Sequence, residues 1–212
     1  MNFKKPGFLF AIAAMFVLAS SAAVFAQNAN FNASRTFQFD PDHTGEAVAF
    51  WKNGIGLSDS SCNTRFGLDL EKNGALSDNV SAGAVLDGLK GVMTSAGDTL
   101  GYDISNASPC GAGAPRFNVS YITPLGVSGF SFVGGCANGT HAPAPQSPLL
   151  WRRVTMDLQN PAQAFPVIPP GSILQSVVLI VDEPGKYLLD NIEFRFQYAD
   201  KPGNSGPSPS CP

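Results

Sequence analysis

Apolar and polar residues alternate one by one along several stretches of this chain, and this period of two constrains its fold more than any other feature. Residues 65–71 read Arg-Phe-Gly-Leu-Asp-Leu-Glu, and the turn-forming Asn73-Gly74 pair follows. Successive side chains of a β-strand point to opposite faces, so this alternation predicts strands with one face in a core and the other in water. The same alternation, or a continuous apolar run, recurs at residues 100–104, 117–121, 154–158, 176–181 and 192–198.

Turn-forming pairs rich in Gly, Pro and Asn separate these stretches. Only residues 82–90 and 161–165 suggest short helices, and Gly83 and Gly88 weaken the first of them. We therefore predict an all-β domain over residues 27–200: a two-sheet antiparallel sandwich of about nine strands, most simply a jelly roll. Residues 201–212 are so rich in Pro, Gly and Ser that we expect a flexible tail.

The first residues of the chain have the pattern of an export signal. Lys4 and Lys5 give a positive start, residues 8–20 carry no charge, and small residues lead to Ala26 before Gln27. This pattern predicts a cleavable signal peptide over residues 1–26 and a secreted protein, either extracellular or periplasmic. The alternative is an uncleaved anchor, but the apolar run is shorter than the roughly 20 residues that span a bilayer. We expect no membrane insertion of the mature chain.

The charge balance limits the partners of the mature chain. The chain has 13 Lys and Arg against 16 Asp and Glu, and two of the basic residues, Lys4 and Lys5, lie in the predicted signal. The remaining charge is negative and dilute, because only 14% of residues are charged. A nucleic acid or an anionic membrane needs a basic surface, so neither is expected as a partner. The composition favours a neutral extracellular ligand.

Four cysteines follow the predicted signal, at positions 62, 110, 136 and 211. An even number in an exported chain favours two disulfides, for which three pairings exist. Cys110 and Cys136 flank a plausible hairpin, so this pair is favoured, and Cys62 with Cys211 then follows by elimination. Free buried thiols are the alternative.

The last apolar alternation, at residues 192–198, places Asp190 at core parity near the start of a strand. The Asp190-Asn191-Ile192 element resembles the closing strand of jelly-roll carbohydrate-binding modules. That resemblance implies a structural calcium held by Asp190 with partners from the first strand, for which Asp40 and Asp42 are the candidates. The alternative is that Asp40 and Asp42 cap the backbone amides of a turn.

The candidate ligand-binding residues are those that can stack on a sugar or bind its hydroxyl groups. Arg116 and Asn118 share a polar face opposite Phe117 and Val119. Trp151 follows a Pro-rich loop and is predicted to be exposed. Tyr121 and His141 are added as aromatic candidates, although Tyr121 shares the face of the core residues in its strand. The full set is Arg116, Asn118, Tyr121, His141 and Trp151.

The sequence offers little for catalysis. His43 and His141 are the only histidines, and neither lies in a metal-binding His-x-x-x-His or beside a nucleophile motif. We therefore expect no enzyme, and no cofactor beyond the calcium implied above. The favoured function is a secreted binding module for a glycan or polysaccharide. The alternatives are a structural or adhesive protein of an envelope or matrix, and a secreted hydrolase on the same scaffold.

Overall fold

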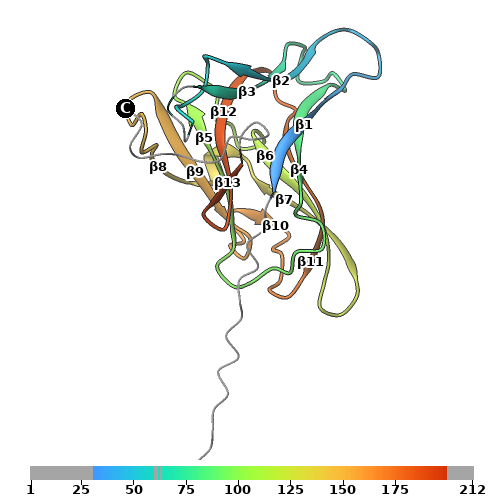
Figure 1. Cartoon of the computed structure of the whole chain (residues 1–212). Coiled ribbons are helices and arrows are strands. Elements are labelled where there is room, and N and C mark those ends of the chain that lie inside the picture. Colours follow the sequence, from blue (N-terminus) through green and yellow to red (C-terminus); the bar gives the residue numbers. More distant parts are fainter. Residues whose placement is uncertain (1–30, 60–61, 63, 200–212) are drawn as a thin grey trace, which may run out of the picture.

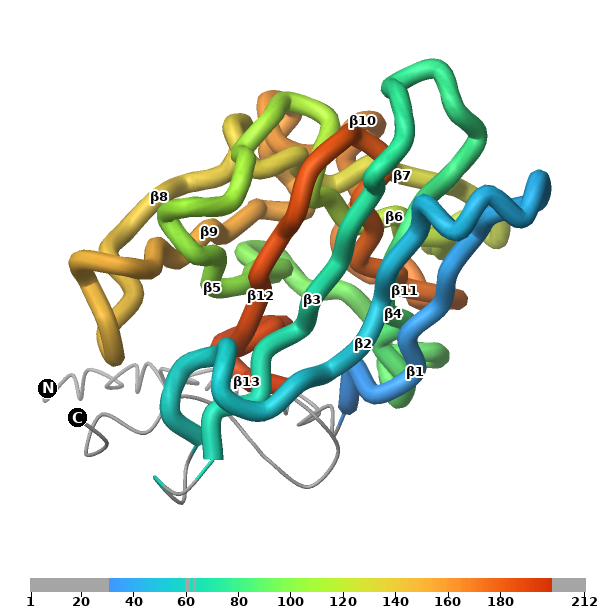
Figure 2. The backbone as a smooth tube through the Cα atoms, turned by 90° about the horizontal axis from the view of Figure 1, so that it is seen from above, coloured from blue at the N-terminus to red at the C-terminus, as the bar shows by residue number. Residues whose placement is uncertain are grey.

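The computed structural model describes residues 31–59, 62 and 64–199, and these form two antiparallel sheets packed face to face (Figure 1, Figure 2). The strands are β1 (Asn32–Phe39), β2 (Ala47–Asn53), β3 (Phe66–Lys72), β4 (Ser81–Asp87), β5 (Thr99–Ser105), β6 (Arg116–Ile122), β7 (Ser128–Gly134), β8 (Thr140–Pro143), β9 (Trp151–Asp157), β10 (Ala164–Phe165), β11 (Ile173–Val181), β12 (Gly185–Phe194) and β13 (Gln197–Ala199). The first sheet has the order β1-β4-β11-β6-β7-β10. The second has the order β2-β3-β12-β5-β9-β8, with β13 beside β12. Figure 1 shows β8 and β9 at one side of the molecule and β1, β4 and β11 at the other.

The predicted all-β sandwich is confirmed, with thirteen strands in the described part of the chain rather than about nine. The excess comes from short strands such as β8, β10 and β13, which are too brief to leave a periodic pattern in the sequence. The jelly-roll connectivity stays a prediction. The predicted signal, residues 1–26, and the predicted tail, residues 201–212, lie outside the described residues.

Both helix predictions are wrong. Residues 82–90 supply most of β4, which pairs with β1 on one side and β11 on the other, and residues 161–165 end in β10. Gly83 is needed as glycine here, because a Cβ on it would overlap the ring of Phe37 in the neighbouring strand. The described residues contain one 3-10 turn, Cys136–Asn138, and no helix among them is long and apolar enough to cross a membrane.

The core lies between the sheets and is built from the inward positions of the alternating strands. Tyr102 of β5 and Phe117 of β6 meet across it with ring centroids 5.8 Å apart, and both are fully buried. The Tyr102 hydroxyl donates to the carbonyl of Pro115 at 2.9 Å, which satisfies its one polar group inside the core. At the open edge, the indole of Trp51 on β2 donates to the carbonyl of Ala33 on β1 at 2.8 Å. These contacts fix one sheet on the other.

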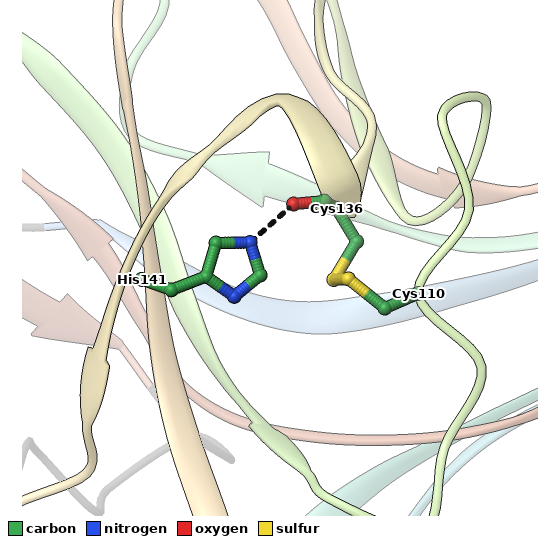
Figure 3. A group of neighbouring side chains, drawn as sticks. All are labelled: Cys110, Cys136 and His141. Atoms are coloured by element: carbon green, nitrogen blue, oxygen red, sulfur yellow. Dashed lines mark hydrogen bonds between the residues drawn. A yellow bond between two sulfur atoms is a disulfide. The ribbon is translucent and has the colours of Figure 1, made fainter.

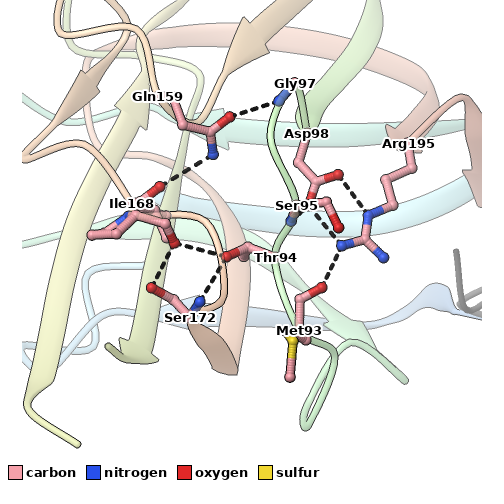
Figure 4. Close-up of polar contacts among 10 residues, drawn as sticks. Met93, Thr94, Ser95, Gly97, Asp98, Gln159, Ile168, Ser172 and Arg195 are labelled. Carbon is pink, nitrogen blue, oxygen red and sulfur yellow. Dashed lines mark hydrogen bonds and ion pairs between the residues drawn. The ribbon is translucent and has the colours of Figure 1, made fainter. Parts of the chain in front are cut away.

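The predicted strand over residues 192–198 is broken. β12 ends at Phe194, and Arg195 and Phe196 adopt positive φ values of 53° and 60°, which turn the chain back into β13. The Arg195 side chain holds this turn, because it donates to both carboxylate oxygens of Asp98 at 2.7 and 2.6 Å and also to the carbonyl of Met93 (Figure 4). Phe196, predicted to face the core, is 75% exposed as a result.

The same end of the sandwich is joined by a small polar network (Figure 4). The hydroxyls of Thr94 and Ser172 both donate to the carbonyl of Pro169, at 2.9 and 2.7 Å. The amide oxygen of Gln159 accepts the backbone N–H of Gly97 at 2.9 Å. These hydrogen bonds join loops that are distant in the sequence.

Candidate ligand-binding face

The side of the first sheet that is turned away from the core, called the outer face below, carries the two predicted ligand residues that the structure brings together. Along β6, Phe117 and Val119 are fully buried, whereas Arg116 and Asn118 are half-buried on the opposite side. The alternation predicted from the sequence therefore holds, and it turns an Arg and an Asn outward at the middle of a six-stranded sheet.

One row of side chains crosses the outer face from edge to edge. Residues that pair directly in neighbouring antiparallel strands point to the same side of a sheet, so the pairings between these strands define the row. It runs Phe165, Phe132, Asn118, Val178, Val85, Arg35. A single polar amide, that of Asn118, thus lies between aromatic and aliphatic neighbours.

Phe130, Phe132 and Phe165 form an exposed aromatic surface, called the phenylalanine platform below. They are 46%, 44% and 46% exposed, and the rings of Phe130 and Phe132 meet edge to face with centroids 5.0 Å apart. Ser131 and Val133, which alternate with the two phenylalanines along β7, point the other way and are fully buried. The Ser131 hydroxyl donates to the carbonyl of Pro166. Clustered exposed aromatic rings are typical of a binding surface rather than of an inert one.

Arg116 forms a fixed polar centre beside this platform. It donates to both carboxylate oxygens of Asp182 at 2.6 Å, to Asn118 Oδ1 at 3.1 Å and to the carbonyl of Gly113 at 2.9 Å. Its guanidinium also stacks on Phe132, 5.1 Å from the ring centroid. The charge of Arg116 is therefore balanced by its own ion pair, and its side chain, 15% exposed, is held in one place.

Asn118 keeps hydrogen-bonding capacity for a ligand. Its Oδ1 accepts from Arg116, which fixes the orientation of the amide. None of the described residues accepts a hydrogen bond from its Nδ2, which carries two donors. These donors lie between Phe132 and Val178 in the row.

A polar pocket of about 250 Å³ opens at one end of the outer face. It is reached along β11 from the Arg116–Asp182 pair, because Ile180 pairs with Arg116 and Asp182 follows shortly after it. The pocket is lined by Phe39, Lys72, Leu76, Asp78, Asn79, Val80, Ser81, Ile180 and Asp182.

Two predicted ligand residues, Tyr121 and Trp151, are buried and do not lie on the outer face. Tyr121 is 4% exposed, and its ring packs directly over Gly129 in the core. Trp151 was predicted to be exposed, but it is 7% exposed and packs with Leu57 and Leu188 on the far side of the second sheet. There it lines a separate pocket of about 290 Å³.

His141 lies on the exposed edge strand β8, next to the disulfide between Cys110 and Cys136 (Figure 3). This disulfide is the pairing favoured from the sequence. The His141 Nε2 is 2.8 Å from the carbonyl oxygen of Cys136. The three side chains are close enough to bind a metal, but both sulfurs are used in the S–S bond, so the group is a cross-link. Cys211 lies outside the described residues, and its pairing with Cys62 stays a prediction.

The three predicted calcium ligands are not brought together in the described part of the chain. The exposed Asp40 carboxylate accepts the N–H groups of Thr44 and Gly45 at 3.0 and 2.7 Å, and the bond from Thr44 lowers its pKa. This is the turn-capping arrangement that was the alternative for Asp40 and Asp42. Asp190 is instead buried within the second sheet, on β12.

Asp190 serves to attach a loop. Its Oδ2 accepts the backbone N–H of Leu57 at 2.5 Å, and its Oδ1 accepts that of Asn191 at 2.7 Å. Asn191 has a φ of 43°, and the pairing of β12 with β5 shifts register at this point. Because of this irregularity, the Asp190 side chain does not point into the core between the sheets, as the regular alternation predicted.

The glycine-rich segment before β6 also contacts an acid of the same chain. The carboxylate of Glu183 occupies the space that a Cβ on Gly111 or on Gly113 would need. The missing side chains of these two glycines thus leave room for an internal carboxylate.

Sequence reasoning missed the phenylalanine platform, because residues 128–134 were not among the stretches predicted as strands. A signal was present: residues 128–134 read Ser-Gly-Phe-Ser-Phe-Val-Gly, which puts Phe130 and Phe132 on one face of a strand. The comparisons of this chain with protein-family models, curated proteins and solved structures found no match, so the function has to be inferred from the arrangement of its residues.

Proposed function

We propose that this chain is a secreted, non-catalytic binding protein that holds a neutral glycan or polysaccharide on its outer face. The observation that carries this proposal is the phenylalanine platform lying directly beside the fixed polar centre of Arg116, Asp182 and Asn118. Sugars need both kinds of surface, because their CH faces stack on aromatic rings while their hydroxyl groups require polar partners.

Electrostatics favour a ligand without charge. Arg116 is paired with Asp182, and Arg35, at the other end of the row, is paired with Asp87. An acidic glycan would find no unpaired cation in the row, and it would meet the carboxylates that already occupy both arginines. Neutral hydroxyl groups can still use the Asn118 donors and the remaining lone pairs of Asp182.

The same exposed rings support a second function, self-association in a structural or adhesive protein. Phe130, Phe132 and Phe165 are 44–46% exposed on neighbouring strands, and a patch of this kind can also be covered by a second protein molecule. The two functions differ in a simple measurement, because only self-association makes the sedimentation coefficient depend on protein concentration.

The test is a binding screen of the secreted chain against neutral and acidic polysaccharides, repeated with Phe132→Ala. Phe50 is a matched control: it is also a strand phenylalanine, 39% exposed, but it lies on β2 of the second sheet. We expect Phe132→Ala to weaken binding to a neutral polysaccharide by roughly 1–3 kcal/mol, and Phe50→Ala to leave it unchanged.

Equal losses in both variants would remove the outer face as the site, and binding to no glycan at all would refute the proposed function. Release of reducing ends from the polysaccharide during the assay would contradict the non-catalytic assignment.

A further inference from the structure

The polar pocket at the Asp182 end of the outer face is continuous with the phenylalanine platform. Phe39 pairs with Ser81 at the end of β4, and Ile180 pairs with Arg116 in the middle of the sheet. Asp182 borders the pocket and also forms the ion pair with Arg116. A ligand on the polar centre therefore reaches the pocket without leaving the face.

The lining of this pocket matches a sugar ring. Phe39, 48% exposed, and Ile180 provide an apolar wall, while the Asn79 amide and the Ser81 hydroxyl provide donors and acceptors. Each Asp182 oxygen accepts one N–H from Arg116, which leaves lone pairs for ligand hydroxyl groups. The one cation in the lining, Lys72, is buried and donates to the carbonyl of Asp78 at 2.6 Å.

The distance between pocket and platform sets the size of the ligand. Asp182, which borders the pocket, directly follows β11 and is four residues after Val178, which corresponds to about 13 Å at the rise of a β-strand. Phe132 of the platform lies on β7, two strands away from Val178 in the row, which adds roughly 9–10 Å across the sheet. A single sugar cannot cover both places, whereas a chain of several sugars can.

Resting on the glycan-binding function proposed above, we infer that the pocket is a subsite for one neutral sugar residue of a longer chain. The phenylalanine platform holds the body of the chain, and the pocket takes its terminal or branching residue. The ligand is then an oligosaccharide or polysaccharide recognised through both subsites, and not a free monosaccharide.

The test measures affinity against chain length. Cello-, chito-, manno- and xylo-oligosaccharides, from disaccharides to hexasaccharides, are titrated into the wild-type chain and into Phe39→Ala, Asn79→Ala and Phe132→Ala. Wild-type affinity is expected to rise with length until both subsites are filled. The two pocket variants are expected to lose about tenfold in affinity for the long oligosaccharides only, which corresponds to about 1.4 kcal/mol. Phe132→Ala is expected to lose affinity at every length.

Asn79 is exposed, and its side chain forms no hydrogen bond with the described residues, so Asn79→Ala is expected to fold and serves as the comparison for Phe39→Ala. Wild-type affinity for the long oligosaccharides in both pocket variants, together with a loss in Phe132→Ala, would overturn the pocket subsite and leave the proposed function intact. No binding of any oligosaccharide or polysaccharide by the wild-type chain would overturn both.

Discussion

Asp103 and Asp190 lie directly opposite each other on β5 and β12, although they are only 0% and 1% exposed. Two buried carboxylates in register would repel each other if both lacked partners. Each has its own donors: Arg153 donates to both oxygens of Asp103 at 2.8 and 2.7 Å, and Asp190 accepts the N–H of Leu57. Asn191 also donates to Asp103, at 2.6 Å. The two carboxylates can lie side by side because Asp103 is paired with a cation and Asp190 accepts hydrogen bonds from backbone N–H groups.

Removing the arginine should reveal this dependence. Arg153→Ala would leave Asp103 charged and buried without its cation, so we expect the free energy of unfolding to fall by about 3–5 kcal/mol. Arg35→Ala is the control, because it breaks an ion pair with Asp87 that is exposed and screened by solvent, so its effect on stability should be much smaller. Chemical denaturation of both variants measures the difference. Equal losses would mean that the pair with Asp103 contributes no more than a surface ion pair.

Glu193 makes the stability depend on pH. Burial raises its pKa above the ordinary value of 4.5, against the opposing effect of hydrogen bonds from Phe196 and Thr99. The folded chain therefore binds this proton more tightly than the unfolded chain, and the free energy of unfolding falls as pH rises from 4.5 through the raised pKa. In Glu193→Gln this loss is absent. The variant should gain stability relative to the wild type as pH rises through that interval.

Denaturation midpoints of the variants and the wild type between about pH 2 and pH 8 test the sign. Glu71→Gln provides the opposite case, since the hydrogen bond from Lys186 lowers the pKa of Glu71. Relative to the wild type, that variant should lose stability as pH rises through the interval below 4.5. A stability difference for Glu193→Gln that does not change with pH would show that its carboxyl titrates alike in the folded and unfolded chain.

The packing of Glu183 against the glycine-rich segment gives a third prediction. Gly111→Ala and Gly113→Ala each place a methyl group where the carboxylate of Glu183 lies, so each should destabilise the fold by about 1–3 kcal/mol. Ala112→Ser, at the exposed position between them, should be nearly neutral. Thermal unfolding distinguishes these cases, and wild-type melting of both alanine variants would show that Glu183 moves aside freely.

Trp151 should matter for folding and not for binding. Its indole packs with Leu57 and Leu188, far from the outer face, so Trp151→Ala should lower the free energy of unfolding by about 3–5 kcal/mol. At a temperature where this variant is folded, its affinity for the polysaccharide identified with the wild type should be unchanged. A selective loss of affinity would restore Trp151 as a ligand residue.

The sequence was sufficient for the strands whose alternation is simple. Residues 117–121 correctly placed Phe117 inside and Arg116 and Asn118 outside, because local alternation and burial agree there. On β7 they disagree. Ser131 is buried because the carbonyl of Pro166 satisfies its hydroxyl, and the phenylalanines beside it point outward. A count of apolar residues alone assigns that strand to the wrong face.

The remaining errors come from contacts between distant segments. Trp151 is covered by Leu57 and Leu188, which no local pattern connects to it. The chain reverses at Arg195 because Asp98 holds its side chain, which ended the strand predicted over residues 192–198. Such contacts form only when the two sheets have assembled, so the local alternation of apolar and polar residues cannot predict them.

The alternation along β7 separates two tasks within one strand. Ser131 and Val133 fill the interior, whereas the rings of Phe130 and Phe132 contribute to the surface alone. Under the proposed function, ligand specificity would therefore change by substitution at the outward positions, while the inward positions keep the fold intact. Natural selection or protein engineering could therefore substitute the outward residues of this sheet without changing the core that holds the fold.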